Sequence, residues 1–189
     1  YDIPRSVTII NNRAFNGCSV LQRIDLPNSV TSIGDSSFFR CSSLQTVDIP
    51  NSVVSLGDSA FAFCSSLLSI DIPSSVTNIG KRAFSSCKVL TAITLPEGIT
   101  TIREGTFASC TSLTSITIPA NVTTIGSSAF EGCTALASVN ISAGVTSILD
   151  RAFEGCSSLT GITVDANNTV YSSDEFGVLY HHCQAGIYR

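Results

Sequence analysis

Large apolar side chains recur along this chain at a constant interval of 23 residues, with polar, serine- and threonine-rich stretches between them. Leucine, proline, phenylalanine and cysteine each keep this interval, and a chance distribution does not give four residue types one common period. A period of 20–50 residues indicates a repeat array such as a solenoid. The phenylalanine column contains Phe15, Phe38, Phe61, Phe84, Phe107, Phe130 and Phe153, and the cysteine column contains Cys18, Cys41, Cys64, Cys87, Cys110, Cys133 and Cys156.

The first part of each repeat has the pattern of a short strand. In the unit that begins at Leu113, the side chains of Leu113, Ile116 and Ile118 have the spacing L-x-x-L-x-L, and the last two alternate as in a strand. Pro119 has no backbone N–H to donate, so we expect this strand to end there.

The second part of the repeat predicts another short extended segment and a helical turn. Residues 122–125 can form a second short extended segment, which Gly126 closes. Phe130 and Cys133 stand three residues apart, which is the spacing of neighbours on one helical turn. We therefore expect one short helical turn around Ala129–Cys133, with Phe130 and Cys133 facing the core.

A single repeat is too small to fold alone. Burial of its six large apolar side chains contributes roughly 10–15 kcal/mol, whereas ordering 23 backbone residues costs ~1–2 kcal/mol each. Stacking adds hydrogen bonds between coils and closes the core, which makes the stability cooperative between neighbours. The sequence thus predicts a repeat solenoid of the leucine-rich-repeat type, with parallel β coils, short helical turns and about eight 23-residue repeats.

Composition excludes several classes of partner. Charged residues make up 13% of the chain and the net charge is -4, so there is no basic face for nucleic acid. No apolar run approaches the ~20 residues needed to cross a bilayer, which argues against membrane insertion. Three N-x-S/T sequences are as many as composition alone would give, so glycosylation stays open; they begin at Asn121, Asn140 and Asn167.

The repeats resemble those of the BspA-like leucine-rich repeat family, whose units read IPxSVTxIGxxAFxxCxSLxxI. Ile49–Val53, Ile79–Gly80, Ala83–Phe84 and Cys87–Leu90 all match this pattern. The resemblance covers residues 1–164 and recurs seven times. It implies a cell-surface or secreted module for adhesion and protein binding, with no catalytic residues and no cofactor.

The chain after residue 164 departs from the repeat phase. Asn168 stands where Val145 predicts an apolar residue. We therefore divide the chain into a solenoid, residues 1–164, and a C-terminal cap, residues 165–189. Within the cap, Gly177–Tyr180 and Ile187–Arg189 are expected to pair as a hairpin.

Neither the cysteines nor the histidines predict a metal site. Seven cysteines at one repeat position form a linear column, and zinc needs four ligands that converge on one point. Their parallel side chains also disfavour disulfides, so we expect free buried thiols. His181, His182 and Cys183 are consecutive, and consecutive extended residues point to opposite faces. The chain also lacks the G-x-S-x-G, H-E-x-x-H and P-loop motifs, so it is expected not to be an enzyme.

Two groups of outward residues are the candidate binding residues. Asp2, Asp25, Asp48 and Asp71 share one outward strand position, with Arg23 on the same face. Such a like-charge column is either a solvated stripe or a strip that binds a cationic partner. Phe39 and Phe63 stand just beyond the core phenylalanines of adjacent repeats, so we expect them to lie side by side on the outside of the solenoid. They are either isolated exposed aromatics or a contact patch for a partner.

Three functions fit these patterns. The first is an interaction module that presents its strand face to a protein or extracellular-matrix ligand. The alternative is a structural subunit of a larger extracellular or membrane-associated assembly. The third, binding to ice or crystalline carbohydrate, is prompted by a threonine column that Val54 interrupts; its members are Thr8, Thr31, Thr77, Thr100, Thr123 and Thr146.

Overall fold

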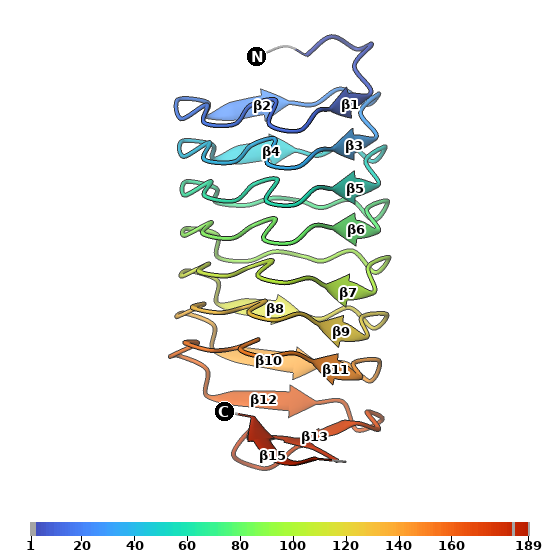
Figure 1. The fold of residues 1–189 in the computed structure, drawn as a ribbon, viewed down its shortest axis with the longest axis vertical. Helices are drawn as coiled ribbons and strands as arrows, with labels where there is room; N and C mark the ends of the chain where they lie inside the picture. Colours follow the sequence, from blue (N-terminus) through green and yellow to red (C-terminus); the bar gives the residue numbers. More distant parts are fainter. Residues whose placement is uncertain (1–2, 183, 189) are drawn as a thin grey trace.

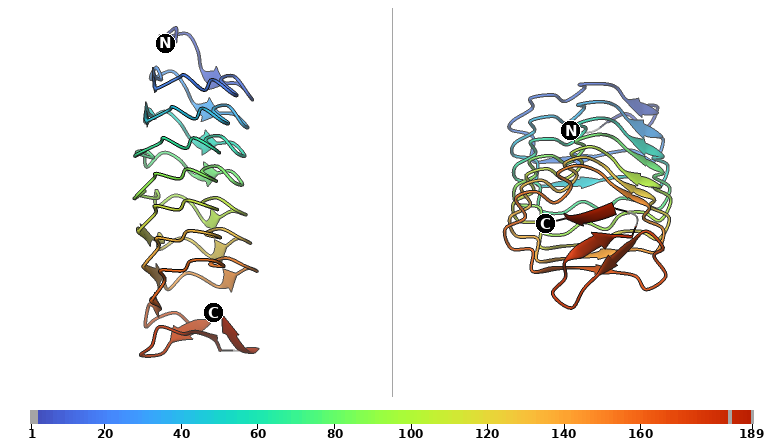
Figure 2. Two further views of the ribbon diagram at one scale, coloured as in Figure 1. Left: turned by 90° about the vertical axis from the view of Figure 1, so that its left-hand side faces the viewer. Right: turned by 60° about the horizontal axis from the view of Figure 1, so that its bottom comes forward.

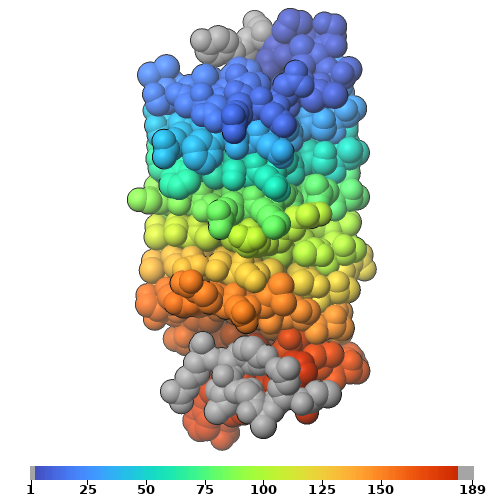
Figure 3. Space-filling model, in the orientation of Figure 1, coloured from blue at the N-terminus to red at the C-terminus, as the bar shows by residue number. Residues whose placement is uncertain are grey.

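The chain forms an elongated parallel β-solenoid of about seven turns (Figure 1, Figure 2). The computed structural model describes residues 3–182 and 184–188, and the side chains of residues 3–182. Figure 3 shows the coils as successive bands of colour, so neighbours in the stack are also neighbours in the repeat order. The predicted leucine-rich-repeat solenoid is confirmed.

One side of the solenoid, here named the strand face, carries the first strand of each repeat. The strands pair in parallel with a register step of one repeat, so that Ile24 lies beside Val47 and Asp25 beside Asp48. In the middle of the rod the ladder narrows to single bridges at Asp71, which pairs with Asp48 and Thr94. The strands of this face are β2 (Arg23–Asp25), β4 (Thr46–Asp48), β8 (Ser115–Thr117), β10 (Ser138–Ile141) and β12 (Gly161–Val164).

A second side carries the second extended segment of each repeat as two parallel sheets. Each strand has two residues, of which the second faces the core, as in β1 where Ile9 is exposed and Ile10 is buried. These strands are β1 (Ile9–Ile10), β3 (Ser32–Ile33), β5 (Ser55–Leu56), β6 (Asn78–Ile79), β7 (Thr101–Ile102), β9 (Thr124–Ile125) and β11 (Ser147–Ile148).

The third side, here named the turn side, contains turns where a helical turn was predicted, and that detail is wrong for the described residues. Cys133 donates to the Phe130 carbonyl, an i to i−3 bond of 3.1 Å, but the N–H of Phe130 itself donates to the next coil at 2.8 Å. Ser128 and Gly132 have positive φ values of 56° and 70°. A helix needs negative φ throughout and donors that stay within the segment, so stacking between coils replaces it.

The phenylalanine and cysteine columns form the centre of the core. The rings from Phe15 to Phe153 stack along the rod at centroid distances of 5.1–5.7 Å and interplanar angles of 2–11°. Cys18 is exposed, whereas the other six thiols of the column are buried. Each of these six donates from Sγ to the carbonyl of a phenylalanine in the preceding coil, as Cys110 does to Phe84 at 3.2 Å.

An antiparallel sheet follows the last coil. It consists of β13 (Tyr171–Ser173), β14 (Leu179–His181) and β15 (Gln184–Tyr188), with β14 in the centre. Leu179 lies opposite Tyr188, and Tyr180 opposite Ile187. Arg189, the end of the predicted hairpin, lies outside the described residues, and the boundary at residue 164 stays a prediction.

Asn168 closes the core at the start of this sheet. Its side chain is 6% exposed. Its Nδ2 donates to the carbonyls of Ser142 and Val145, both at 2.9 Å, and its Oδ1 accepts from the N–H groups of Val170 and Tyr171 at 2.9 and 2.8 Å. The amide therefore satisfies carbonyls that the last coil leaves open, which explains a polar residue at an apolar repeat position.

Candidate functional site

The acidic column lies on the strand face near the beginning of the rod. Asp25 ends β2, Asp48 ends β4, and Asp71 bridges to Asp48 on the next coil, so the three carboxylates stand in register on successive coils. All three are exposed. Asp2, the fourth predicted member of the column, lies outside the described residues.

Arg23 lies between the first two carboxylates of this column. Its Nε donates to Asp25 and its guanidinium Nη2 to Asp48, both at 3.0 Å. The hydrogen bond to Asp25, with the charges of Asp25 and Asp48, raises the pKa of Arg23 above its ordinary value. Among the described residues, Asp71 is the member of the column with no ion pair. The unneutralised charge of the stripe is therefore concentrated at Asp71.

The strand face loses its negative charge further along the rod. The position of the acidic column is occupied there by Thr94, Thr117, Asn140 and Thr163. Thr163 contacts Asn140 across the coils, with Oγ1 and Oδ1 3.5 Å apart. One surface thus changes from carboxylates to neutral hydrogen-bonding groups over its length.

Phe39 and Phe63 form a second group, on the turn side of the solenoid. Their rings meet edge to face, with centroids 5.4 Å apart and planes at 68°. The guanidinium of Arg40 lies 5.2 Å from the Phe39 centroid and 5.7 Å from that of Phe63. These distances fit a cation–π interaction with both rings. Phe63 is 43% exposed, while Phe39 is partly buried.

The backbone at Phe63 is in the left-handed region, with φ at 61°. Arg40 has φ at 59° at the same repeat position, where Gly17, Gly132 and Gly155 stand in other coils. A bulky residue with positive φ is uncommon, because its Cβ crowds the backbone. Phe63 and Arg40 therefore hold a conformation that glycine adopts at lower cost, and both project from it toward solvent.

Arg40 was not among the residues that the sequence singled out. The signal was present in the repeat alignment, since Arg40 and Phe63 replace a recurrent glycine at one position. The sequence did predict that Phe39 and Phe63 lie side by side.

The two candidate groups occupy different sides of the solenoid. Strands β2 and β4, which carry Arg23 and the first two carboxylates, lie behind the turns in Figure 1, and Phe39 and Phe63 belong to those turns. A ligand that binds to one side of the solenoid therefore contacts either the acidic column or the aromatic group, and not both.

The two histidines point to different partners. The His181 ring meets the Tyr171 ring edge to face at 5.1 Å, and His182 Nδ1 lies 2.9 Å from the Thr169 carbonyl. Cys183, the third member of that sequence cluster, lies outside the described residues. Within the described part of the chain, no three His, Cys, Asp or Glu side chains are grouped as metal ligands would be.

Several hydroxyl groups of the exposed threonine column form hydrogen bonds within the protein. Thr31, Thr123 and Thr146 each donate from Oγ1 to the carbonyl of the preceding threonine in the column, at 3.1–3.3 Å. These hydroxyl protons are therefore already engaged.

In the described residues there is no helix that could span a membrane.

The register, the buried aromatic column and the outward strand face define a leucine-rich repeat protein. The chain belongs to the BspA-type leucine-rich repeat family: the BspA type Leucine rich repeat region matches residues 1–110 and 87–178, with 6 copies. None of the curated proteins compared with the chain matches it.

Solved structures of bacterial proteins have the same fold. A leucine rich cell surface protein from Faecalibacterium prausnitzii is 38% identical with a TM-score of 0.83, and the match covers 93% of this chain and 46% of that protein. The Treponema protein TpLRR, from T. pallidum, is 34% identical with a TM-score of 0.75, covering 82% of this chain and 72% of that one. A leucine-rich repeat protein from Bacteroides ovatus is 27% identical, covers 86% and 54%, and has a TM-score of 0.65. The chain thus spans about half of the Faecalibacterium protein.

Proposed function

We propose that the chain is a non-catalytic module, displayed at the cell surface or secreted, that binds a protein or matrix ligand through its strand face. The observation that carries this proposal is the column of exposed, in-register carboxylates at Asp25, Asp48 and Asp71. Membership of a leucine-rich repeat family and the similarity to a leucine rich cell surface protein support it.

The electrostatics of the strand face favour a cationic ligand at the early coils. Carboxylates that repeat every ~4.8 Å lie within the ~8 Å Debye length at physiological salt, so their potentials add. Arg23 offsets part of this charge beside Asp25 and Asp48, which leaves Asp71 as the strongest attraction. The neutral coils that follow supply hydrogen bonds without charge. A ligand with a basic patch beside a polar surface matches this gradient.

The test replaces Asp25, Asp48 and Asp71 together with Asn, which keeps the shape and removes the charge. Binding of an oligolysine peptide and of immobilised extracellular-matrix proteins is measured at low and at physiological salt. We expect the triple variant to lose affinity for the ligands that bind, together with most of the salt dependence, because charge attraction is screened by salt.

The matched control is Asp58→Asn, Glu97→Gln and Glu175→Gln, which removes three exposed carboxylates outside the stripe. It should bind as the parent does. Equal binding by the parent and the triple Asn variant would exclude the stripe, and variants at Phe39 and Phe63 would then test the turn side. Ordered self-assembly without any ligand would instead favour a structural subunit.

A further inference from the structure

The turn side of the solenoid ends in a row of three backbone donors. In the coil before the last, the N–H groups of Ser128, Phe130 and Gly132 donate to carbonyls of the next coil at 2.7–2.9 Å. One repeat later, the corresponding N–H groups have no hydrogen-bond acceptor among the residues that the structure describes; they belong to Arg151, Phe153 and Gly155. We name these three groups the terminal donor row.

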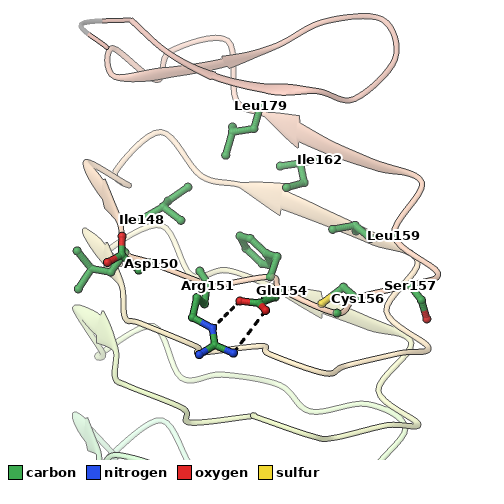
Figure 4. Close-up of a pocket in the computed structure, with 13 residues that line it drawn as sticks. Ile148, Asp150, Arg151, Glu154, Cys156, Ser157, Leu159, Ile162 and Leu179 are labelled. Carbon is green, nitrogen blue, oxygen red and sulfur yellow. Dashed lines mark hydrogen bonds and ion pairs between the residues drawn. The ribbon is translucent and has the colours of Figure 1, made fainter. Parts of the chain in front are cut away.

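The phenylalanine column ends at the same place. Phe130 is stacked on both sides and fully buried, whereas Phe153 stacks on Phe130 alone and is partly exposed. Its outer side lines a cavity of about 570 Å³, between the last coil and the antiparallel sheet. Ile162 of β12 and Leu179 of β14 contribute apolar walls (Figure 4). This volume is in the range of sites that hold small ligands or a few residues of a peptide.

The next phenylalanine of the chain does not fill this cavity. Phe176 stands one repeat after Phe153 in sequence, yet it is 75% exposed. Asp174 holds its loop outward, because Oδ1 of Asp174 accepts from the N–H groups of Phe176 and Val178 at 3.0 and 2.9 Å. Gly177 stands one repeat after Glu154, whose carbonyl accepts from the N–H of Gly132 in the preceding coil. The Gly177 carbonyl does not continue this row, because it accepts from the N–H of Ile162 at 3.0 Å.

We infer that this cavity is a binding site for a peptide segment of a partner protein, with one aromatic side chain between backbone carbonyls that point to one side. The aromatic ring stacks on Phe153 as the next member of the column. The carbonyls on either side of it accept from the terminal donor row, as those of the next coil do elsewhere in the rod. This site is separate from the strand face, so it adds a second contact to the proposed function and does not depend on it.

The charges at the rim define the residues that flank the aromatic side chain. Arg151 is paired with both Glu131 and Glu154, so its charge is already used. Asp150 adds another carboxylate beside the cavity. The rim is therefore negative on balance, and it favours neutral or basic flanking residues over acidic ones.

The probe is a synthetic peptide with the sequence of residues 127–133, with blocked ends and with Ser in place of Cys133 and Gln in place of Glu131. In the solenoid this segment covers the coil that contains Phe107, and its Phe130 stacks on Phe107. The peptide is expected to cover the last coil in the same way, with its ring on Phe153. Hydrogen exchange of the Arg151, Phe153 and Gly155 amides is followed by NMR, with the amides of Ser128, Phe130 and Gly132 as internal controls. We expect fast exchange in the free protein and at least about tenfold slower exchange with saturating peptide.

Two variants make the result specific. A peptide with Ala in place of Phe130 should bind at least about tenfold more weakly, since it loses the ring that stacks. In the protein, Leu179→Trp fills the cavity and should abolish peptide binding, whereas Leu68→Trp, at an exposed position of the strand face, should not. Melting temperatures show that both proteins are folded.

Three results would overturn the inference. One is that the peptide leaves the exchange of the terminal donor row unchanged. Another is equal binding by the Phe and Ala peptides. The third is slow exchange of the three amides in the free protein that becomes fast in Phe176→Ala, which would show that the chain's own loop occupies the cavity.

Discussion

Phe107 lies between the rings of Phe84 and Phe130, at centroid distances of 5.7 and 5.5 Å, and it is fully buried. Replacing it with Ala removes both stacking contacts and leaves a cavity that two rigid neighbours cannot close. We expect Phe107→Ala to lower the free energy of unfolding by ~3–5 kcal/mol, measured by urea denaturation. Phe176→Ala, at a 75% exposed position, is the control and should change it by less than ~0.5 kcal/mol. Equal stability of Phe107→Ala and the parent would contradict the role of the column.

Single residues also show where sequence reasoning was limited. The phenylalanine column was predictable because a buried ring at one position must recur wherever coils stack. The side-by-side placement of Phe39 and Phe63 followed from the same periodicity. The positive φ of Phe63 and the position of Arg40 over both rings did not. Backbone conformation in a turn depends on hydrogen bonds to the adjacent coils, and these are not visible in one repeat.

At the scale of elements, the strands were predictable and the turns were not. Two-residue alternation and Pro119 gave β8 its place, because a strand's pattern reports the face that it buries. The i, i+3 spacing of Phe130 and Cys133 predicted a helical turn, since that spacing is common to helices and to successive tight turns. The N–H of Phe130 donates to the next coil, and this competing partner decides the outcome. The acidic column was likewise predicted as a set, but the two contacts of Arg23 require coordinates.

The turn into the cap depends on Asn168. The repeat pattern favours an apolar residue at this position, so Asn168→Leu would be stabilising if packing alone mattered. We expect the reverse, a loss of about 3 kcal/mol or more in the free energy of unfolding. The reason is that two carbonyls and two N–H groups lose their partners in a buried place.

The neighbouring residue provides the control for this substitution. Asn167 is exposed, and its side-chain Nδ2 donates within the turn to Asp165 Oδ1 at 3.1 Å. Asn167→Leu should therefore leave the midpoint of urea unfolding nearly unchanged. A stable Asn168→Leu protein would show that the cap is held by apolar contacts and not by this amide.

At the scale of the whole molecule, the cysteine column lowers the free energy of unfolding as the pH becomes alkaline. Burial raises the pKa of Cys110 to about 12 and that of Cys156 to about 11, from an ordinary value of 9.0. Burial also raises the pKa of Cys64, Cys87 and Cys133. In the unfolded chain these thiols ionise near their ordinary value, so the unfolded state releases protons first. Stability is therefore full below pH 9.0 and is lost as the pH rises toward the folded values.

This effect is measured as the fall in melting temperature between neutral pH and about pH 10, under reducing conditions. Cys110→Ser keeps a donor of similar size that does not ionise in this range. We expect a smaller alkaline fall in Cys110→Ser than in the parent. An identical fall in both proteins would assign the pH dependence to other groups that ionise at alkaline pH, such as lysines and tyrosines.

The stacked phenylalanines also give the rod an optical property. Seven rings are nearly parallel and evenly spaced over the length of the solenoid, and electronic transitions of closely spaced parallel chromophores couple to one another. The chain contains no tryptophan, and its 4 tyrosines absorb most strongly at longer wavelengths than phenylalanine, so the weak phenylalanine bands can be distinguished from them. Their circular dichroism in the near ultraviolet then reports on the order of the stack, and a coil that separates from its neighbour can be followed without any added label.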